Sequence, residues 1–131
     1  MLKLPRSRVR SVGLLLLALF WIVAGLNHFR DPAFYLRIMP PWLPAHEALV
    51  AWSGVAEVAG GIAVLIPRLR VLAGWGLIVL LVAIYPANVE MALHPERFPD
   101  IPTWALYARL PFQFVFAIWA WWATRPDEAT R

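Results

Sequence analysis

The 131-residue chain is too apolar for an ordinary soluble domain, because 61% of its residues are hydrophobic and only 15% are charged, against about 25% charged residues in soluble domains. A domain of this size has too little core to hide that apolar surface, so we expect a lipid bilayer to cover it. The absence of cysteine excludes disulfides and thiolate chemistry, and the net charge of +4 arises from short basic clusters beside apolar runs, a pattern typical of membrane proteins rather than of nucleic-acid binding.

Four apolar runs along the chain are each long enough to cross a membrane as a helix. They cover residues 12–28, 49–66, 71–93 and 104–123. A spanning helix needs about 20 mostly apolar residues, within a range of about 17–25, and the runs lack the alternation of β-barrel strands. The sequence therefore predicts one all-α membrane domain over residues 1–131, a bundle of four transmembrane helices.

The connection between the first two runs is predicted to hold a short interfacial helix. Asp31 suits a helix N-cap and Pro32 the first helical position. The residues that follow, up to Met39, are largely apolar, as in helices that lie on a membrane surface. Residues 40–44 contain three prolines and cannot be helical, so we expect a stiff, extended segment there.

Basic residues are divided unevenly between the two ends of the predicted bundle. The segments on the side of the N-terminus hold eight Lys and Arg residues, and the opposite segments hold three. Because basic loops stay on the cytoplasmic side, we expect a multi-pass protein with both termini in the cytoplasm. The eight are Lys3, Arg6, Arg8, Arg10, Arg68, Arg70, Arg125 and Arg131, and the three are Arg30, Arg37 and Arg97.

Eight polar residues lie inside the apolar runs or at their ends, where polar side chains are expensive. In the predicted topology all of them fall in the outer half of the bundle, whereas the inner halves of the helices are nearly all apolar. A charge near mid-bilayer costs about 3 kcal/mol, so such residues face the bundle interior. One polar cavity that opens outward accounts for their common depth. They are Asn27, His28, Ser53, Glu57, Asn88, Glu90, Arg109 and Gln113.

Five of these residues form the candidate ligand-binding set. They are His28, Glu57, Asn88, Arg109 and Gln113. Because Glu57 and Arg109 have opposite charges at matched depth, we expect an ion pair between the second and fourth spanning helices. This pair would either belong to the site or only lock the bundle.

No metal site and no cofactor held by the chain itself are expected, and no catalytic residue is identified. Haem ligation needs axial ligands that face each other at one depth, and His28, His46 and His94 do not form such a pair. His46 and His94 are expected at the membrane interface, beside an outer aromatic belt. The belt comprises Tyr35, Trp42, Trp52, Trp104 and Tyr107.

Ordered motifs over nearly the whole chain resemble the DoxX family. They are GLNHF at residues 25–29, PPWLP at residues 40–44, LIPR at residues 65–68, YPANVEMA at residues 85–92 and RLPFQ at residues 109–113. The resemblance implies a four-helix bundle in the bacterial cytoplasmic (inner) membrane. A relative of the family, DoxD, is a subunit of a thiosulfate:quinone oxidoreductase, which implies redox partner proteins and a quinone.

The leading hypothesis is therefore a membrane subunit that binds a quinone, or a similar lipophilic ligand, in the outward-facing polar cavity. His28, Arg109 and Gln113 would offer hydrogen bonds to carbonyl oxygens, and Glu57 would tune Arg109 or relay a proton. One alternative is a non-catalytic scaffold or assembly protein in which the polar cluster is structural. The other is a small transporter, which four helices without an internal repeat would support only as a homo-oligomer.

Overall fold

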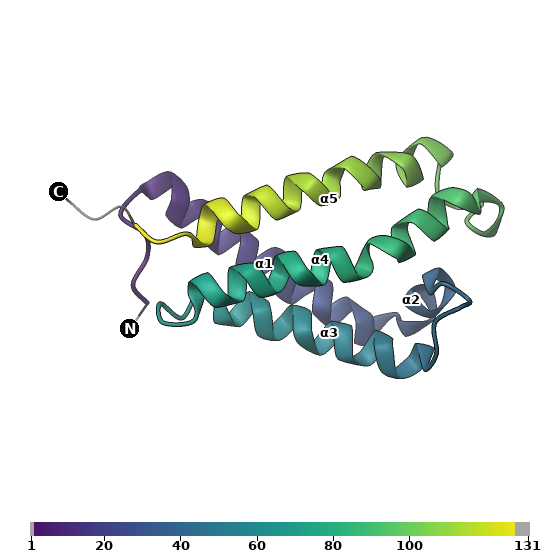
Figure 1. Ribbon diagram of the computed structural model, residues 1–131, viewed down its shortest axis with the longest axis horizontal. Coiled ribbons are helices and arrows are strands. Elements are labelled where there is room, and N and C mark those ends of the chain that lie inside the picture. The colour runs from purple at the N-terminus through teal and green to yellow at the C-terminus, as the bar shows by residue number, and fades with distance from the viewer. Residues whose placement is uncertain (1, 128–131) are drawn as a thin grey trace.

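The computed structural model describes residues 2–127 and forms an elongated bundle of helices (Figure 1). The all-α prediction is confirmed: each apolar run coincides with a long helix, and a short helix occupies the first connection. In chain order the elements are α1 (Arg8–Arg30), α2 (Pro32–Ile38), α3 (His46–Ala63), α4 (Arg70–Leu93), the 3-10 turn η1 (Pro95–Arg97) and α5 (Thr103–Thr124).

The first connection folds partly as the sequence predicts. Asp31 caps α2, its carboxylate accepting a hydrogen bond from the Phe34 N–H at 3.4 Å, and Pro32 takes the first helical position. The expected extended segment at residues 40–44 is wrong, because the Leu43 N–H donates to the Pro40 carbonyl at 3.1 Å and closes a turn. A proline has no N–H to donate, but its carbonyl still accepts, and the fixed φ of a proline at the second position favours such a turn.

The four long helices are arranged as two closely packed pairs, α1 with α3 and α4 with α5. The first pair approaches at two facing glycines, since a Cβ built on Gly25 would lie 2.7 Å from the Gly54 carbonyl oxygen. Small residues allow such backbone contact between membrane helices. The pairs meet at an apolar core that includes Leu17, Trp21 and Leu81. A second core at the far end contains Ile38, Met91, Phe98 and Leu106.

The connections of the bundle fall at two opposite ends. The start of α1, the turn between α3 and α4 and the end of α5 share one end, and α2 and η1 lie at the other (Figure 1). At the first end Arg10 donates to Asp127 at 2.8 Å and Arg70 donates to the Lys3 carbonyl at 2.6 Å. The basic end predicted from the sequence is therefore one physical end of the molecule, although Arg131 lies outside the described residues.

The bundle exterior is apolar along its length. By length and composition, α1 and α4 are apolar enough to cross a membrane. Large apolar side chains are nevertheless exposed on all four long helices. Examples are Leu16 on α1, Val55 on α3, Val79 on α4 and Phe114 on α5.

Candidate functional site

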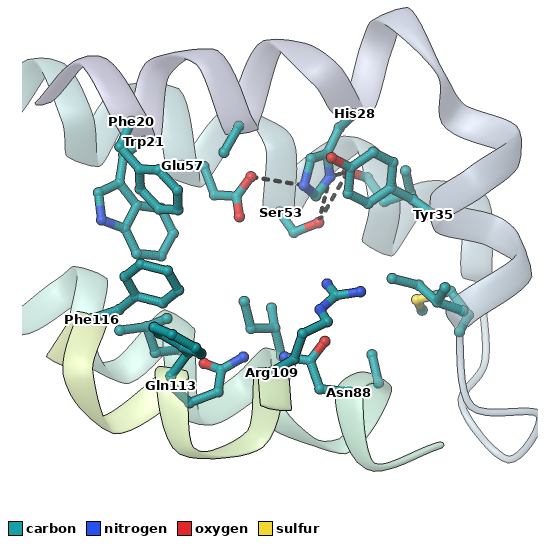
Figure 2. Close-up of a pocket in the computed structure, with 18 residues that line it drawn as sticks. Phe20, Trp21, His28, Tyr35, Ser53, Glu57, Asn88, Arg109, Gln113 and Phe116 are labelled. Carbon is teal, nitrogen blue, oxygen red and sulfur yellow. Dashed lines mark hydrogen bonds and ion pairs between the residues drawn. The ribbon is translucent and has the colours of Figure 1, made fainter. Parts of the chain in front are cut away.

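A cavity of about 430 Å³ lies between the two helix pairs, and all five α-helices contribute to its wall. The structure brings together all five sequence-predicted site residues on this wall (Figure 2). They are His28 from α1, Glu57 from α3, Asn88 from α4, and Arg109 and Gln113 from α5. The polar residues of four long helices therefore face one space.

Two of the other polar residues are used elsewhere. Asn27 donates its side-chain amide to the Tyr35 hydroxyl at 2.9 Å and so ties α1 to α2. Glu90 interacts with Arg97 at 3.3 Å and with His94 at 3.4 Å, at the C-terminal end of α4. Neither side chain lines the cavity, whereas Ser53 does.

His28 is the centre of the wall formed by α1 and α3. Its Nδ1 lies 3.0 Å from the Val50 carbonyl oxygen and 3.2 Å from the Ser53 hydroxyl. Its ring stacks on Tyr35, with 3.8 Å between ring centroids. Because a carbonyl oxygen can only accept, Nδ1 carries a hydrogen and the other nitrogen, Nε2, is left to interact with the remaining neighbour.

That neighbour is Glu57, whose Oε2 lies 2.7 Å from Nε2 of His28, although the contact is not aligned as a good hydrogen bond. Both side chains are buried. Two acceptor atoms do not approach to this distance without a proton between them. The pair therefore holds one shared proton and has no net charge, whichever of the two carries it.

The expected ion pair between Glu57 and Arg109 is not formed. The close contact of α1 with α3 at Gly25 and Gly54 turns Glu57 toward His28, and Arg109 projects from α5 on the opposite wall (Figure 2). Matched depth along the membrane normal does not reveal which helix lies next to which, and this is why the sequence indicated the wrong partner.

The wall formed by α4 and α5 leaves its polar groups poorly satisfied. The Arg109 guanidinium contacts the Met91 sulfur at 3.3 Å, and within residues 2–127 no carboxylate lies at ion-pair distance from it. The Gln113 Oε1 is buried without a hydrogen-bond partner in the described part of the chain, and so is the Trp21 Nε1 across the cavity. An unpaired buried polar atom costs about 1–3 kcal/mol, so this wall is less well satisfied than the wall of α1 and α3.

Aromatic side chains close the other end of the cavity. Phe20 stacks on Phe116 with ring centroids 5.0 Å apart and meets Trp21 edge to face at 5.7 Å. Leu81 and Ile84 of α4 complete this apolar part. The cavity thus has a polar region at His28 and Arg109 and an apolar region at Phe20 and Phe116 (Figure 2).

Tyr35 is a site residue that the sequence did not identify. It was predicted to belong to the outer aromatic belt, but it lines the cavity beside His28, whereas Trp42, Trp52 and Trp104 are exposed. Burial raises the pKa of the Tyr35 phenol above its ordinary value, so the side chain stays neutral. Nothing in the sequence around Tyr35 distinguishes a tyrosine that lines a cavity from one that lies at the membrane interface.

Comparison with known proteins gives one result. A protein-family model described as a domain of unknown function (DUF8561) matches residues 17–124. No curated protein and no solved structure matches the chain. The matched region runs from the apolar core of α1 to the last residue of α5 and contains every residue of the cavity wall.

Proposed function

The chain belongs to the DUF8561 family, and we propose that it is a four-span membrane protein that binds a lipophilic ligand with a compact polar head, with a quinone as the first candidate. The observation that carries the proposal is the cavity itself. It combines an apolar aromatic region with unpartnered polar groups, and it lies between two helix pairs that are each well packed.

The exterior of the bundle supports four spans rather than two. The outward faces of α3 and α5 expose Trp52, Phe114 and Ile118, each about as exposed as Val79 of the apolar helix α4. A soluble protein rarely exposes so continuous an apolar surface, whereas lipid tails would cover it. The few charged residues of these two helices face the interior or lie near the ends, as expected if the outward faces contact lipid, where a charge is costly.

The two ends of the bundle support the predicted orientation. Seven of the eight basic residues counted on the cytoplasmic side lie within the described chain, at the end where α1 begins and α5 finishes. This charge bias favours a cytoplasmic position for that end, and a position on the outer side of a bacterial inner membrane for the α2 end. The cavity then lies in the outer half of the bilayer.

Orientation can be tested directly because the natural chain has no cysteine. We expect single cysteines at Arg37 and Arg97 to react with an impermeant thiol reagent in cells whose inner membrane is accessible from outside. A cysteine at Arg68, in the turn between α3 and α4, is expected to react only after the membrane is broken. Labelling of position 68 but not of 37 in intact cells would reverse the orientation.

A quinone fits the two walls in complementary ways. Its carbonyl oxygens would accept hydrogen bonds from Arg109 and from the Gln113 amide on one wall. The shared proton of the His28–Glu57 pair lies on the other wall. Glu57 would thus act on His28, not on Arg109. A ring and tail would occupy the apolar region at Phe20 and Phe116. Pockets of about 300–1,000 Å³ hold ligands of this size.

The resemblance to the DoxX family supports a place for this quinone site in a redox complex. In that arrangement a partner protein would supply or accept the electrons, because the chain has no thiol for redox chemistry. The scaffold alternative also has an observation in its favour, since the buried His28–Glu57 pair joins α1 to α3 and would stabilise the bundle without any ligand.

The experiment is binding of a short-tailed quinone to the protein in nanodiscs, with a melting curve for each variant. Gln113→Leu removes a donor and an acceptor at nearly constant size, so we expect a several-fold loss of affinity, about the value of one neutral hydrogen bond. The matched control is Leu110→Ala, one turn away on α5 and outside the cavity wall. No quinone binding by the natural protein would contradict the quinone proposal, and a change in melting alone would favour the scaffold.

A further inference from the structure

The charge balance of the cavity wall is the starting point. Four titratable side chains line it: His28, Tyr35, Glu57 and Arg109. The His28–Glu57 pair has no net charge because the 2.7 Å contact between Nε2 and Oε2 requires one proton on one of the two side chains, and Tyr35 is neutral. Arginine stays protonated in proteins. The wall therefore carries one net positive charge, located on Arg109.

Nothing in the described chain neutralises that charge. The guanidinium offers five N–H donors in a planar fork, and its one hydrogen-bond contact within residues 2–127 is with the thioether of Met91 at 3.3 Å, a weak acceptor. Glu57 lines the same cavity but is held by His28. An uncompensated charge in an apolar surrounding is unfavourable, and a counter-charge from a bound molecule would remove the penalty.

We propose that the head group bound in this cavity is an anion with two oxygens, carried by an apolar tail, as in a long-chain carboxylate. This inference rests on the proposed function, a lipophilic ligand with a compact polar head, and takes a lipophilic acid in place of a neutral quinone as that ligand. The planar fork of Arg109 matches two anionic oxygens. The apolar tail would lie along Phe20, Phe116 and Leu81.

The neighbouring groups suit an anion as well. The Trp21 ring lines the apolar region of the same cavity, where the tail would lie, and its Nε1 faces away from Arg109 (Figure 2). Glu57 would repel an anion if it were a free carboxylate, but its position against His28 Nε2 cancels its charge. The His28–Glu57 pair therefore lets one wall stay neutral while the other wall attracts the head group.

The test compares two probes that differ only in charge, laurate and methyl laurate, each labelled with ¹³C at the carbonyl carbon. Both are added to the protein in phosphatidylcholine nanodiscs, and the resonance of the protein-bound form is followed against empty nanodiscs. We expect laurate to bind and methyl laurate to bind at least about tenfold more weakly, the smaller end of the range for hydrogen bonds to a charged group. Equal binding of the two probes would overturn the inference.

Variants link the selectivity to one side chain. Arg109→Gln is expected to reduce laurate affinity about tenfold to a hundredfold and to abolish the preference for the acid over its ester. Arg109→Lys keeps the charge without the fork and should retain part of the preference. The control is Arg30→Gln, which removes an exposed positive charge at the C-terminal end of α1. It should leave the preference for the acid intact. Because misfolding would weaken both probes together, the ratio of the two affinities is the decisive quantity.

Two further measurements distinguish a lipid phosphate from a free acid as the anion, and the anionic ligand from the quinone of the proposed function. Replacing part of the phosphatidylcholine by phosphatidylglycerol should displace laurate if a lipid phosphate is the natural head group, and should leave it bound if a free acid is. The short-tailed quinone serves as a third probe. If it binds as tightly as laurate, the cavity is a ligand site but the anionic preference is wrong. If none of the three probes binds, the proposed function fails and this inference fails with it.

Discussion

The two walls of the cavity differ in how well their polar groups are satisfied. On the α1–α3 wall, His28 contacts Val50, Ser53 and Glu57, and the helices touch at facing glycines. On the α4–α5 wall, Arg109 has only a sulfur contact, and Gln113 keeps a buried oxygen without a partner among the described residues. One wall therefore stabilises the bundle through its own contacts, and the other wall is where the proposed ligand would find unsatisfied polar groups.

The largest expected effect comes from breaking the satisfied wall. His28→Leu would leave the Glu57 carboxylate buried without its partner, and losing one member of a buried pair commonly costs about 3–5 kcal/mol. The double variant His28→Leu with Glu57→Leu should be much milder, because both charges are gone. Melting in nanodiscs measures all three variants. A double variant as unstable as the sum of the single ones would show that the two side chains do not interact.

The next largest effect is expected from the contact of α1 with α3 at Gly25 and Gly54, which brings His28 and Glu57 together. Gly25→Ala places a Cβ 2.7 Å from both the Gly54 oxygen and a Val58 methyl, so α1 and α3 must separate, at about 1–3 kcal/mol as for other overpacked sites. Gly76→Ala is the matched control, because nothing lies within 4 Å of a Cβ at that position of α4. There we expect a gain of about 0.5–1 kcal/mol from lower chain entropy. Equal effects at the two glycines would contradict the close packing of α1 with α3.

The unsatisfied wall should respond in the opposite direction. Arg109→Met removes a partly buried charge that has no carboxylate partner in residues 2–127. The unliganded protein should therefore become more stable, by about 0.5–2 kcal/mol. Gains of this size are common when a residue that is kept for function at the expense of stability is replaced. Binding should be lost in the same variant. A marked loss of stability would mean that Arg109 is a structural residue like His28.

The smallest effect concerns the pair that the structure does not form. Because Glu57 contacts His28 and not Arg109, the variants Glu57→Gln and Arg109→Gln should be additive within about 0.5 kcal/mol in a thermal cycle. A larger coupling energy would show that the two charges meet across the cavity in the membrane, as their matched depth in the predicted bundle suggests.

The sequence predicted helices well and partners poorly, for a physical reason. Hydropathy and the Asp31–Pro32 cap act locally along the chain, so the helix positions and the start of α2 followed from the residues themselves. The common depth of the five polar residues predicted a shared cavity, and the structure has all five on one cavity wall. The partner of Glu57 depends on the rotation and neighbours of each helix. Those are fixed by Gly25 against Gly54, a contact between residues far apart in the chain.

Tyr35 illustrates the same limit. Its helix has only seven residues, with apolar side chains on most sides, so no periodic pattern could indicate which side faces the interior. The Trp21 nitrogen is a comparable case, since an unpartnered donor is visible only once the surrounding side chains are placed.

The most direct test of the account is mass spectrometry of the molecules that remain bound to the protein purified from its membrane in mild detergent. The central claim is that the wall of Arg109 and Gln113 holds a lipophilic ligand. It predicts one small lipophilic molecule per chain, distinct from bulk phospholipid, retained by the natural protein and by Arg30→Gln but lost from Arg109→Met. Recovery of phospholipid alone, in the proportions of the membrane, or equal retention of the small molecule by Arg109→Met, would contradict the claim.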